Sequence, residues 1–309
     1  MTSVTWTGVY PALLTPFTKS DQVDIPLFLK NLGAQADAGV DGIILGGSLG
    51  EGGSLSSEEK VDLLKRSKDF LQGAIPVVMN IAEPTTRAAV QQAEAAASAG
   101  ADGLMLLPPM RYNADDRETL AHFRAVAAST PLPIMIYNNP VDYKILVTLD
   151  MFEELSGIQT IQAVKESTRD VSNVTRMFNR FGERFKILCG VDTLAYESFC
   201  LGAHGWVAGL VDAFPRETVA IYRLTKAGRH AEALTIYRWF LPVLELDIHP
   251  KLVQYIKLAA TLTGIGSEWV RAPRLVPEEA EKQRILAIIK EALATRPVLP
   301  EYEKDVLLY

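Results

Sequence analysis

The stretch AGVDGIIL, residues 38–45, decides the fold, because two related stretches occur further along the chain. They are AGADGLML at residues 99–106 and LGAHGWVA at residues 201–208. Each one follows a helix-like pattern and leads into a short apolar run. Its first glycine suits the end of a helix, and its second suits a tight entry into a strand. The repeat therefore indicates a helix-to-strand junction used several times, as an architecture of βα units requires.

Short apolar runs of this kind number eight, and helix-compatible stretches separate them. The runs span residues 9–14, 42–47, 76–81, 103–108, 134–138, 161–167, 186–190 and 205–209, and helices are expected over residues 57–71, 85–99, 118–128 and 170–181. Runs that are continuous rather than alternating suggest parallel strands buried on both faces. The pattern predicts a (β/α)₈ barrel, in which active-site groups gather at the carboxyl ends of the strands.

Beyond about residue 229 the pattern becomes helical only. Helices are expected over residues 231–246, 251–263 and 278–295. We therefore expect a catalytic barrel over residues 1–229 and a C-terminal helical extension over residues 230–309 that packs on the barrel and helps to build an oligomer. An independent binding module is the disfavoured alternative, because the connection is short and unlike a linker.

Composition and charge exclude several classes of function. A net charge of −6 argues against a nucleic-acid or anionic-membrane partner, which would favour a basic face. Apolar stretches stay short of the roughly 20 residues that span a bilayer, and the first 17 residues lack the basic region of a signal peptide. Cys189 and Cys200 lie in apolar surroundings, so we interpret them as reduced core thiols of a cytoplasmic protein.

Motifs for metals and nucleotide cofactors are missing from the sequence. The four histidines are far apart and show no metal-ligand spacing; they are His122, His204, His230 and His249. Neither a Walker loop nor a Gly-x-Gly-x-x-Gly fingerprint follows a predicted strand. We therefore expect neither a metal nor an organic cofactor.

Lys165 is the most informative single residue. It lies near the end of the apolar run IQAVKES, residues 161–167. Burying an unpaired ammonium is costly, and desolvation lowers a lysine pKa by disfavouring the charged form. The neutral amine that results is a nucleophile toward carbonyls and imines. The alternative is a lysine whose stem covers apolar surface while its head stays in water.

Two other predicted strand ends carry groups that could act together with Lys165. Tyr137 closes the fifth predicted strand, next to the strand of Lys165, and could relay protons there; the alternative is a packed aromatic ring. The loop GGSLGEGG, residues 46–53, can aim backbone N–H groups at an anion, with Ser48 adding a hydroxyl, although it could also be purely structural. Because no basic residue lies nearby, a lone carboxylate fits better than a polyphosphate. Together the three features suggest a Schiff-base site for a carboxylic substrate.

Five motifs then carry a family resemblance. They are GVYPALLTPF (residues 8–17), GSLGE (47–51), YNNP (137–140), VKES (164–167) and GVD (190–192). In order and spacing the chain resembles the dihydrodipicolinate synthase/N-acetylneuraminate lyase family of Schiff-base enzymes. The resemblance implies a (β/α)₈ barrel, Lys165 as the Schiff-base lysine and Tyr137 as a proton relay. It also implies a homotetramer, built as a dimer of dimers.

The same resemblance implies how a 2-oxo acid would be held. Ser48 and the Leu49 backbone would bind its carboxylate, and Gly190 and Val207 would form the wall of the pocket.

Departures from the synthases bear on the substrate. The synthases carry two threonines where this chain has Ser48 and Leu49, and an arginine that binds the second substrate's carboxylate where this chain has Asp142. An acid at that position would repel the carboxylate. The tyrosine that the synthases lend across a dimer interface aligns with Arg111, and Tyr112 is one step away. Dihydrodipicolinate synthesis is therefore not the expected reaction.

A branch that contains Δ1-pyrroline-4-hydroxy-2-carboxylate deaminase is more similar. The similarity lies in residues 117–127, 205–217 and 236–240, and in the aliphatic residue at position 49. The resemblance implies that Lys165 attacks the ring C=N carbon and that the enamine expels the 4-hydroxyl. Water would then release ammonia and 2-oxoglutarate semialdehyde, without a cofactor.

Three alternative functions stay open. A 2-keto-3-deoxy sugar acid aldolase or dehydratase would use polar groups at the far end of the pocket, with Asn139, Asp142 and Tyr143 as candidates. A dihydrodipicolinate synthase would need Lys144 or Arg111 to replace the missing cation. A non-catalytic 2-oxo acid sensor is disfavoured, since it would not need both Lys165 and Tyr137.

Overall fold

Eight parallel strands of one sheet form the centre of the molecule, in the order β1-β8-β7-β6-β5-β4-β3-β2. The structure is a computed structural model that describes residues 3–109 and 112–302. The strands are β1 (Gly8–Pro11), β2 (Ile43–Leu45), β3 (Val77–Ile81), β4 (Gly103–Leu106), β5 (Ile134–Asn138), β6 (Ile161–Glu166), β7 (Lys186–Cys189) and β8 (Gly205–Ala208). A parallel bridge between Ala12 and Ile44 joins the chain after β1 to β2 and closes the ring. The predicted (β/α)₈ barrel is confirmed.

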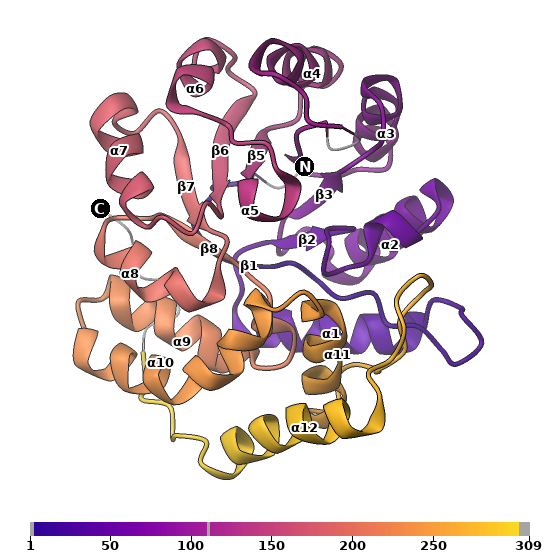
Figure 1. Ribbon diagram of the computed structural model, residues 1–309, viewed down its shortest axis with the longest axis vertical. Coiled ribbons are helices and arrows are strands. Elements are labelled where there is room, and N and C mark those ends of the chain that lie inside the picture. Colours follow the sequence, from indigo (N-terminus) through magenta and orange to yellow (C-terminus); the bar gives the residue numbers. More distant parts are fainter. Residues whose placement is uncertain (1–2, 110–111, 303–309) are drawn as a thin grey trace.

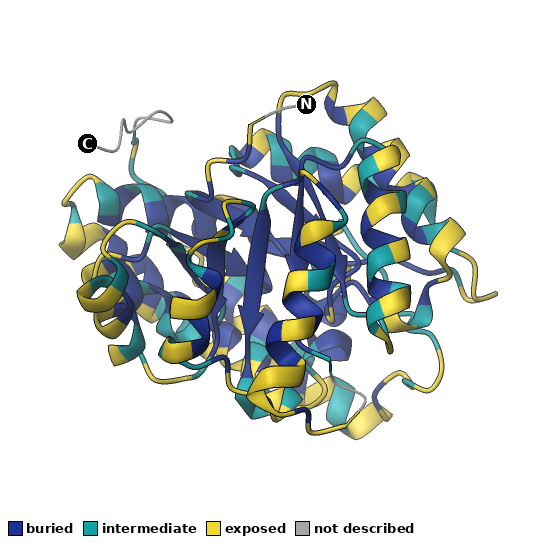
Figure 2. Cartoon of the chain, turned by 90° about the horizontal axis from the view of Figure 1, so that it is seen from above, coloured by how far each residue is buried: buried dark blue, intermediate teal, exposed yellow. Residues whose placement is uncertain are grey.

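Helices alternate with these strands and surround them (Figure 1). They are α1 (Ile25–Ala38), α2 (Ser57–Leu71), α3 (Thr86–Ser98), α4 (Asp116–Ala128), α5 (Pro140–Tyr143), α6 (Leu149–Leu155), α7 (Ser172–Phe181), α8 (Ala195–Cys200) and α9 (Pro215–Lys226), with 3₁₀ turns η1 (Gly52–Ser54), η2 (Asp192–Leu194) and η3 (Leu210–Asp212). Every strand residue is buried except Gln162 and Lys186. Figure 2 shows this contrast, with dark blue strands inside helices whose outer faces are exposed. Burial on both faces explains why the strand sequences are continuously apolar.

The predicted helix-to-strand junction is present at all three repeats. Gly39, Gly100 and Gly202 have left-handed backbone angles, with φ of 84°, 91° and 100°, which residues with a Cβ rarely adopt. Packing explains why the second position of the first repeat, Gly42, is a glycine. A Cβ on Gly42 would overlap the ring of Tyr10. Each junction thus reverses the chain and lets the next strand enter the barrel closely packed.

Three further helices follow the barrel, as predicted. They are α10 (His230–Leu244), α11 (Leu252–Leu262) and α12 (Glu279–Ala294), with the 3₁₀ turn η4 (Glu245–Ile248) between α10 and α11. Figure 1 shows them, in orange and yellow, gathered along one side of the barrel, where α10 packs on α9 and α12 packs on α10 and α11. The division into a barrel over residues 1–229 and an extension over residues 230–309 stays a prediction.

One expectation about the core is wrong. Cys189 is buried in β7, but Cys200 is exposed at the end of α8. Its apolar sequence neighbours misled the prediction, because Phe199 takes the inward position while Leu201 is itself 40% exposed. The cytoplasmic location inferred from the two thiols stays a prediction. Within residues 3–109 and 112–302, no helix combines the length and apolar character that a bilayer span requires.

Candidate active site

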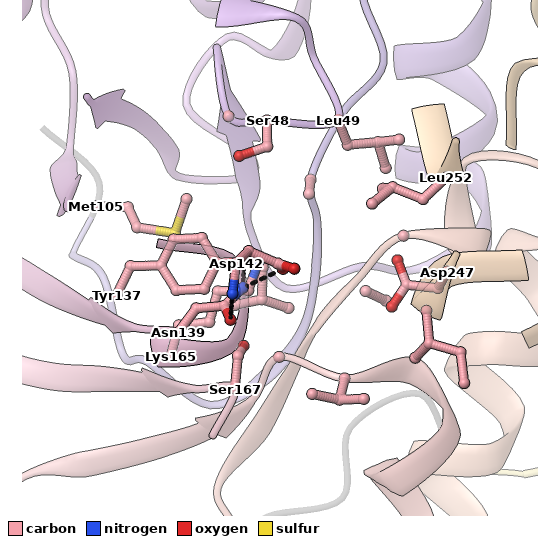
Figure 3. Close-up of a pocket in the computed structure, with 18 of the residues that line it drawn as sticks. Ser48, Leu49, Met105, Tyr137, Asn139, Asp142, Lys165, Ser167, Asp247 and Leu252 are labelled. Atoms are coloured by element: carbon pink, nitrogen blue, oxygen red, sulfur yellow. Dashed lines mark hydrogen bonds between the residues drawn. The ribbon is translucent and has the colours of Figure 1, made fainter. Parts of the chain in front are cut away.

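A pocket opens at the carboxyl ends of the barrel strands and encloses about 720 Å³, part of it open to solvent. Its lining comes from most of the strand ends and from the C-terminal helices (Figure 3). The lining residues are Ala12, Gly47, Ser48, Leu49, Met105, Tyr137, Asn139, Asp142, Tyr143, Lys165, Ser167, Arg169, Gly190, Val191, Val207, Ala208, Gly209, Asp247, Ile248 and Leu252. The barrel thus brings together residues that are up to 240 positions apart in the sequence (Ala12 to Leu252).

Lys165 and Tyr137 form the centre of the pocket. They are directly paired across β5 and β6, and the Lys165 Nζ lies 4.0 Å from the centroid of the Tyr137 ring. Both side chains are 7% exposed. Burial lowers the pKa of the Lys165 ammonium, because the charged form loses its hydration. The geometry provides an amine with an enhanced neutral fraction, which is the form that attacks carbonyl carbon.

The Tyr137 hydroxyl belongs to a short polar chain. The Asn139 amide donates to the Tyr137 oxygen at 3.1 Å and to Asp142 Oδ2 at 2.7 Å. Asn139 also caps α5, since its Oδ1 accepts from the Asp142 backbone N–H at 3.2 Å. Burial raises the pKa of Tyr137 to about 12, so the phenol keeps its proton at neutral pH. It can therefore donate a proton or pass one on, as a relay requires.

The glycine-rich loop after β2 forms the opposite part of the pocket from Lys165. Leu49 is buried, and Ser48 is exposed with its hydroxyl bonded to the Tyr143 phenol. Two side chains from neighbouring strand ends fix the loop. The Asn80 amide donates to Gly46 O at 3.0 Å, and the Thr15 hydroxyl donates to Gly50 O at 2.8 Å. Among the described residues the Ser48 and Leu49 amides donate to no partner. Both are therefore available to an anion such as a substrate carboxylate, and their role as its ligands stays a prediction.

Glu51, in the same loop, is held by a buried ion pair. Its side chain and that of Lys257 in α11 are both fully buried, and Lys257 Nζ donates to Glu51 Oε1. The second oxygen, Oε2, accepts from the Arg271 backbone N–H at 3.1 Å. Lys257 also donates to Trp269 O at 2.7 Å. The C-terminal helices therefore hold the glycine-rich loop in place.

Gly190, after β7, leaves no room for a side chain beside Lys165. A Cβ at this position would lie 2.6 Å from Lys165 Cε and would overlap Ser167 Oγ. The glycine thus permits the packed position of the lysine. Val207, at the end of β8, lines the adjacent wall.

Gly190→Ala should consequently lower turnover by roughly 10²-fold, because an ångström-scale displacement of a reacting group has about that effect. Steady-state kinetics would show the loss, and circular dichroism should stay unchanged. Gly53→Ala is the matched control, since a Cβ there meets nothing within 4 Å. Equal activity of the two variants would contradict this role for Gly190.

Two acids lie beside these residues: Asp192, which is buried, and Asp247, which is half-buried. The Asp192 carboxylate accepts from Trp206 Nε1 at 2.8 Å and from the Leu210 N–H at 2.8 Å, which ties the end of β7 to the end of β8. The backbone N–H of Asp192 donates to Asp247 Oδ2 at 3.3 Å. Burial raises the pKa of Asp192 and of Asp247, the latter to about 8.

Most residues expected at the site line this pocket. Lys165, Tyr137, Ser48, Leu49, Gly190, Val207, Asn139 and Asp142 all do so. Tyr112 does not, because its side chain is 57% exposed outside the pocket, and Arg111 lies outside the described residues.

Among the polar side chains that line the pocket, those of Ser167, Arg169 and Asp247 were not predicted for the site. Ser167 was visible as the end of the VKES motif. Asp247 fell in a break between predicted helices, where no pattern marks a site.

Comparison with known proteins identifies the family. A sequence model of the Dihydrodipicolinate synthetase family matches residues 5–292. The chain belongs to this family. The protein is accordingly a lyase of the dihydrodipicolinate synthetase family, a family of Schiff-base enzymes.

Relatives within the dihydrodipicolinate synthetase family cover nearly the whole chain. A 4-hydroxy-tetrahydrodipicolinate synthase of Exiguobacterium sibiricum is 31% identical over 271 residues, which are 87% of this chain and 90% of the relative. A dihydrodipicolinate synthase from Bacillus anthracis has a similar structure, with a TM-score of 0.89, 26% identity and coverage of 96% and 100% of the two chains. A prophage protein of the family from E. coli K12, solved with pyruvate, gives a TM-score of 0.88, 25% identity and coverage of 94% and 99%.

Proposed function

We propose that the protein forms a Schiff base between Lys165 and the C2 carbon of a small 2-oxo acid or cyclic imino acid. The observation that carries the proposal is the buried Lys165 Nζ, 4.0 Å from the Tyr137 ring centroid, in a pocket also lined by Ser48 and Leu49. Similar structures support it, since one of them was solved with pyruvate, the simplest 2-oxo acid of this kind.

Each group has a defined part in the proposed reaction. The neutral Lys165 amine adds to C2, with Tyr137 moving the protons. Loss of water from a 2-oxo acid, or departure of the ring nitrogen with opening of the ring in a cyclic imino acid, then gives an iminium ion. Ser48 and the Leu49 amide hold the carboxylate. The iminium withdraws electrons from C3, so that loss of a C3 proton gives an enamine that can make or break a bond at this carbon. The lysine is the electron sink, and no cofactor takes part in any of these steps.

Two finer reactions are candidates. The names of the relatives favour 4-hydroxy-tetrahydrodipicolinate synthase, which is the alternative that the sequence left open, over the deaminase. The deaminase is the second candidate, favoured by Leu49 and by the Asp142 carboxyl where the synthases have an arginine, because an acid suits a hydroxyl-bearing substrate better than a second carboxylate. Membership in a family of lyases argues against a non-catalytic sensor.

The test of the proposed function is exchange of the pyruvate methyl protons in D₂O, followed by proton NMR. Enamine formation on Lys165 predicts enzyme-dependent loss of the methyl signal, and absence of exchange would contradict a Schiff base with this 2-oxo acid. Consumption of aspartate semialdehyde together with pyruvate would then identify the synthase. Ammonia release from Δ1-pyrroline-4-hydroxy-2-carboxylate would identify the deaminase.

We also infer a homotetramer, as a dimer of dimers, from the family resemblance. The exposed Tyr112 ring is consistent with a surface that a second chain covers. Light scattering should give four times the chain mass; a mass equal to one chain would contradict the inference.

A further inference from the structure

Asp247 is an acid that the C-terminal segment brings to the barrel mouth. It lies in η4, immediately after α10, and lines the same pocket as Lys165. Figure 3 shows it on the opposite side of the cavity from Tyr137. The pocket therefore has a proton-carrying side chain on each of two facing walls.

Packing fixes the orientation of this carboxyl group. Its Oδ2 accepts from the Asp192 backbone N–H at 3.3 Å. Its Oδ1 lies so close to Gly209 that a Cβ there would come within 2.8 Å of it. The group is thus held between the ends of β7 and β8, and Gly209 gives it room.

Asp247 forms no ion pair within the part of the chain that the structure describes. The described ion pairs do not include it, and the charged groups that act on it are Asp192, Asp142 and Lys165. Burial and the neighbouring Asp192 raise the pKa of Asp247 to about 8. A carboxyl group in such surroundings keeps its proton at neutral pH and can act as an acid.

Ser167 gives an independent sign that a polar ligand atom is expected in this cavity. Ser167 is 2% exposed and lines the pocket, and its Oγ, which lies close to the Tyr137 phenol, has no hydrogen-bond partner of good geometry among the described residues. Buried hydroxyls nearly always have a partner. A polar atom of a bound substrate would supply one.

We propose that Asp247 donates the proton to the oxygen on C4 of the substrate. The proposal rests on the Schiff base at Lys165 and applies to both candidate reactions. In an addition, the enamine C3 bonds to the aldehyde carbon, the carbonyl π electrons move to oxygen, and this oxygen takes the Asp247 proton and becomes a hydroxyl. In an elimination, the enamine electrons form a C3=C4 bond, the C4–O bond breaks, and the oxygen leaves as water with the Asp247 proton. Solvent water returns the proton in either case.

The positions of the groups indicate which proton transfer each one serves. Tyr137 contacts the Lys165 side chain and serves the nitrogen and C2. Asp142 Oδ2 accepts a hydrogen bond from the Asn139 amide at 2.7 Å. Asp247 is the acid that lines the cavity on the wall across from Tyr137.

Asp247→Asn tests this role, because asparagine keeps an acceptor for the Asp192 N–H but carries no acidic proton. Exchange of pyruvate protons in D₂O should stay within twofold of the parent protein. Turnover should fall by roughly 10²- to 10³-fold with whichever substrate the parent protein accepts. The substrates to be tried are pyruvate with aspartate semialdehyde, pyruvate with glyceraldehyde, and Δ1-pyrroline-4-hydroxy-2-carboxylate. In Asp247→Ala, added formate should restore part of this turnover. Glu245→Gln, an exposed acid in the same turn, should change neither measurement.

The outcomes separate this proposal from the one on which it rests. Failure of the parent protein both to exchange pyruvate protons and to release ammonia from Δ1-pyrroline-4-hydroxy-2-carboxylate would contradict the Schiff base itself. Normal exchange with full turnover in Asp247→Asn would overturn the role of Asp247 alone. An equal loss of exchange and turnover, or a parent that exchanges pyruvate but turns over none of the probes, would also overturn it.

Discussion

Lys165→Ala should lower the rate of substrate turnover by roughly 10⁴-fold or more. Losses on this scale are observed when a covalent nucleophile is removed. In the proposed reaction the amine is both the nucleophile and the atom that accepts electrons from C3, so no neighbouring group can replace it. Tyr137 holds its proton too tightly, since its pKa is about 12. Asp247 and Asp142 are acids that cannot form an imine. Product formation under single-turnover conditions is the measurement.

The fold should survive this substitution. Lys165 makes no described ion pair, and its removal relieves the desolvation of a buried amine. Circular dichroism and the midpoint of urea unfolding should therefore match those of the parent protein. Tyr137→Phe is the matched comparison, because it should still form the imine while losing about 10²-fold in turnover. Activity in Lys165→Ala within tenfold of the parent would mean that another residue is the nucleophile.

Lys257→Met should have the largest effect on stability. The substitution removes the closer of the two cations beside the fully buried Glu51 carboxylate and leaves Arg274 Nη1 at 3.8 Å. Breaking a buried ion pair in this way costs about 3–5 kcal/mol. The loop that carries Ser48 and Leu49 should also loosen, because Glu51 anchors it. Urea unfolding at fixed protein concentration measures the first effect, and the KM for the 2-oxo acid measures the second.

Lys251→Met is the matched control. Lys251 pairs with Glu281, but its side chain is 47% exposed, and such surface pairs contribute about 0–1 kcal/mol. Adding Glu51→Gln to Lys257→Met should recover part of the lost stability, since the uncompensated buried charge disappears. If the two single lysine variants unfold at the same urea concentration, the Glu51–Lys257 pair does not hold the loop.

The barrel was predictable because its sequence signals are local and repeated. The junction glycines at 39, 100 and 202 mark a backbone angle that favours glycine, and continuous apolar runs mark strands buried on both faces. Helix α2 begins and ends where expected, at Ser57 and Leu71, because Ser56 and Glu59 form a capping box that is legible in the sequence. The short helices α5, α6 and α8 were not predicted, since 4 to 7 residues give too few turns for a helical pattern.

The centre of the site was predictable for a different reason. Strand order fixes which side chains meet, so Tyr137 and Lys165 on β5 and β6 had to be neighbours once the barrel was assumed. Asp247 could not be found in this way. It lies in a turn between two helices of the C-terminal extension, and only the packing of η4 against the strand ends brings it to Lys165. Cys200 shows the reverse error, where apolar neighbours in sequence did not imply a buried position.

The most direct test of the Lys165 Schiff base is reduction with borohydride in the presence of pyruvate, followed by peptide mass spectrometry. Reduction of the imine should add one 1-carboxyethyl group to the peptide that contains Lys165, and Lys165→Ala should show no adduct. An adduct on a different lysine, or none on the parent protein with either pyruvate or Δ1-pyrroline-4-hydroxy-2-carboxylate, would contradict Lys165 as the residue that carries the chemistry.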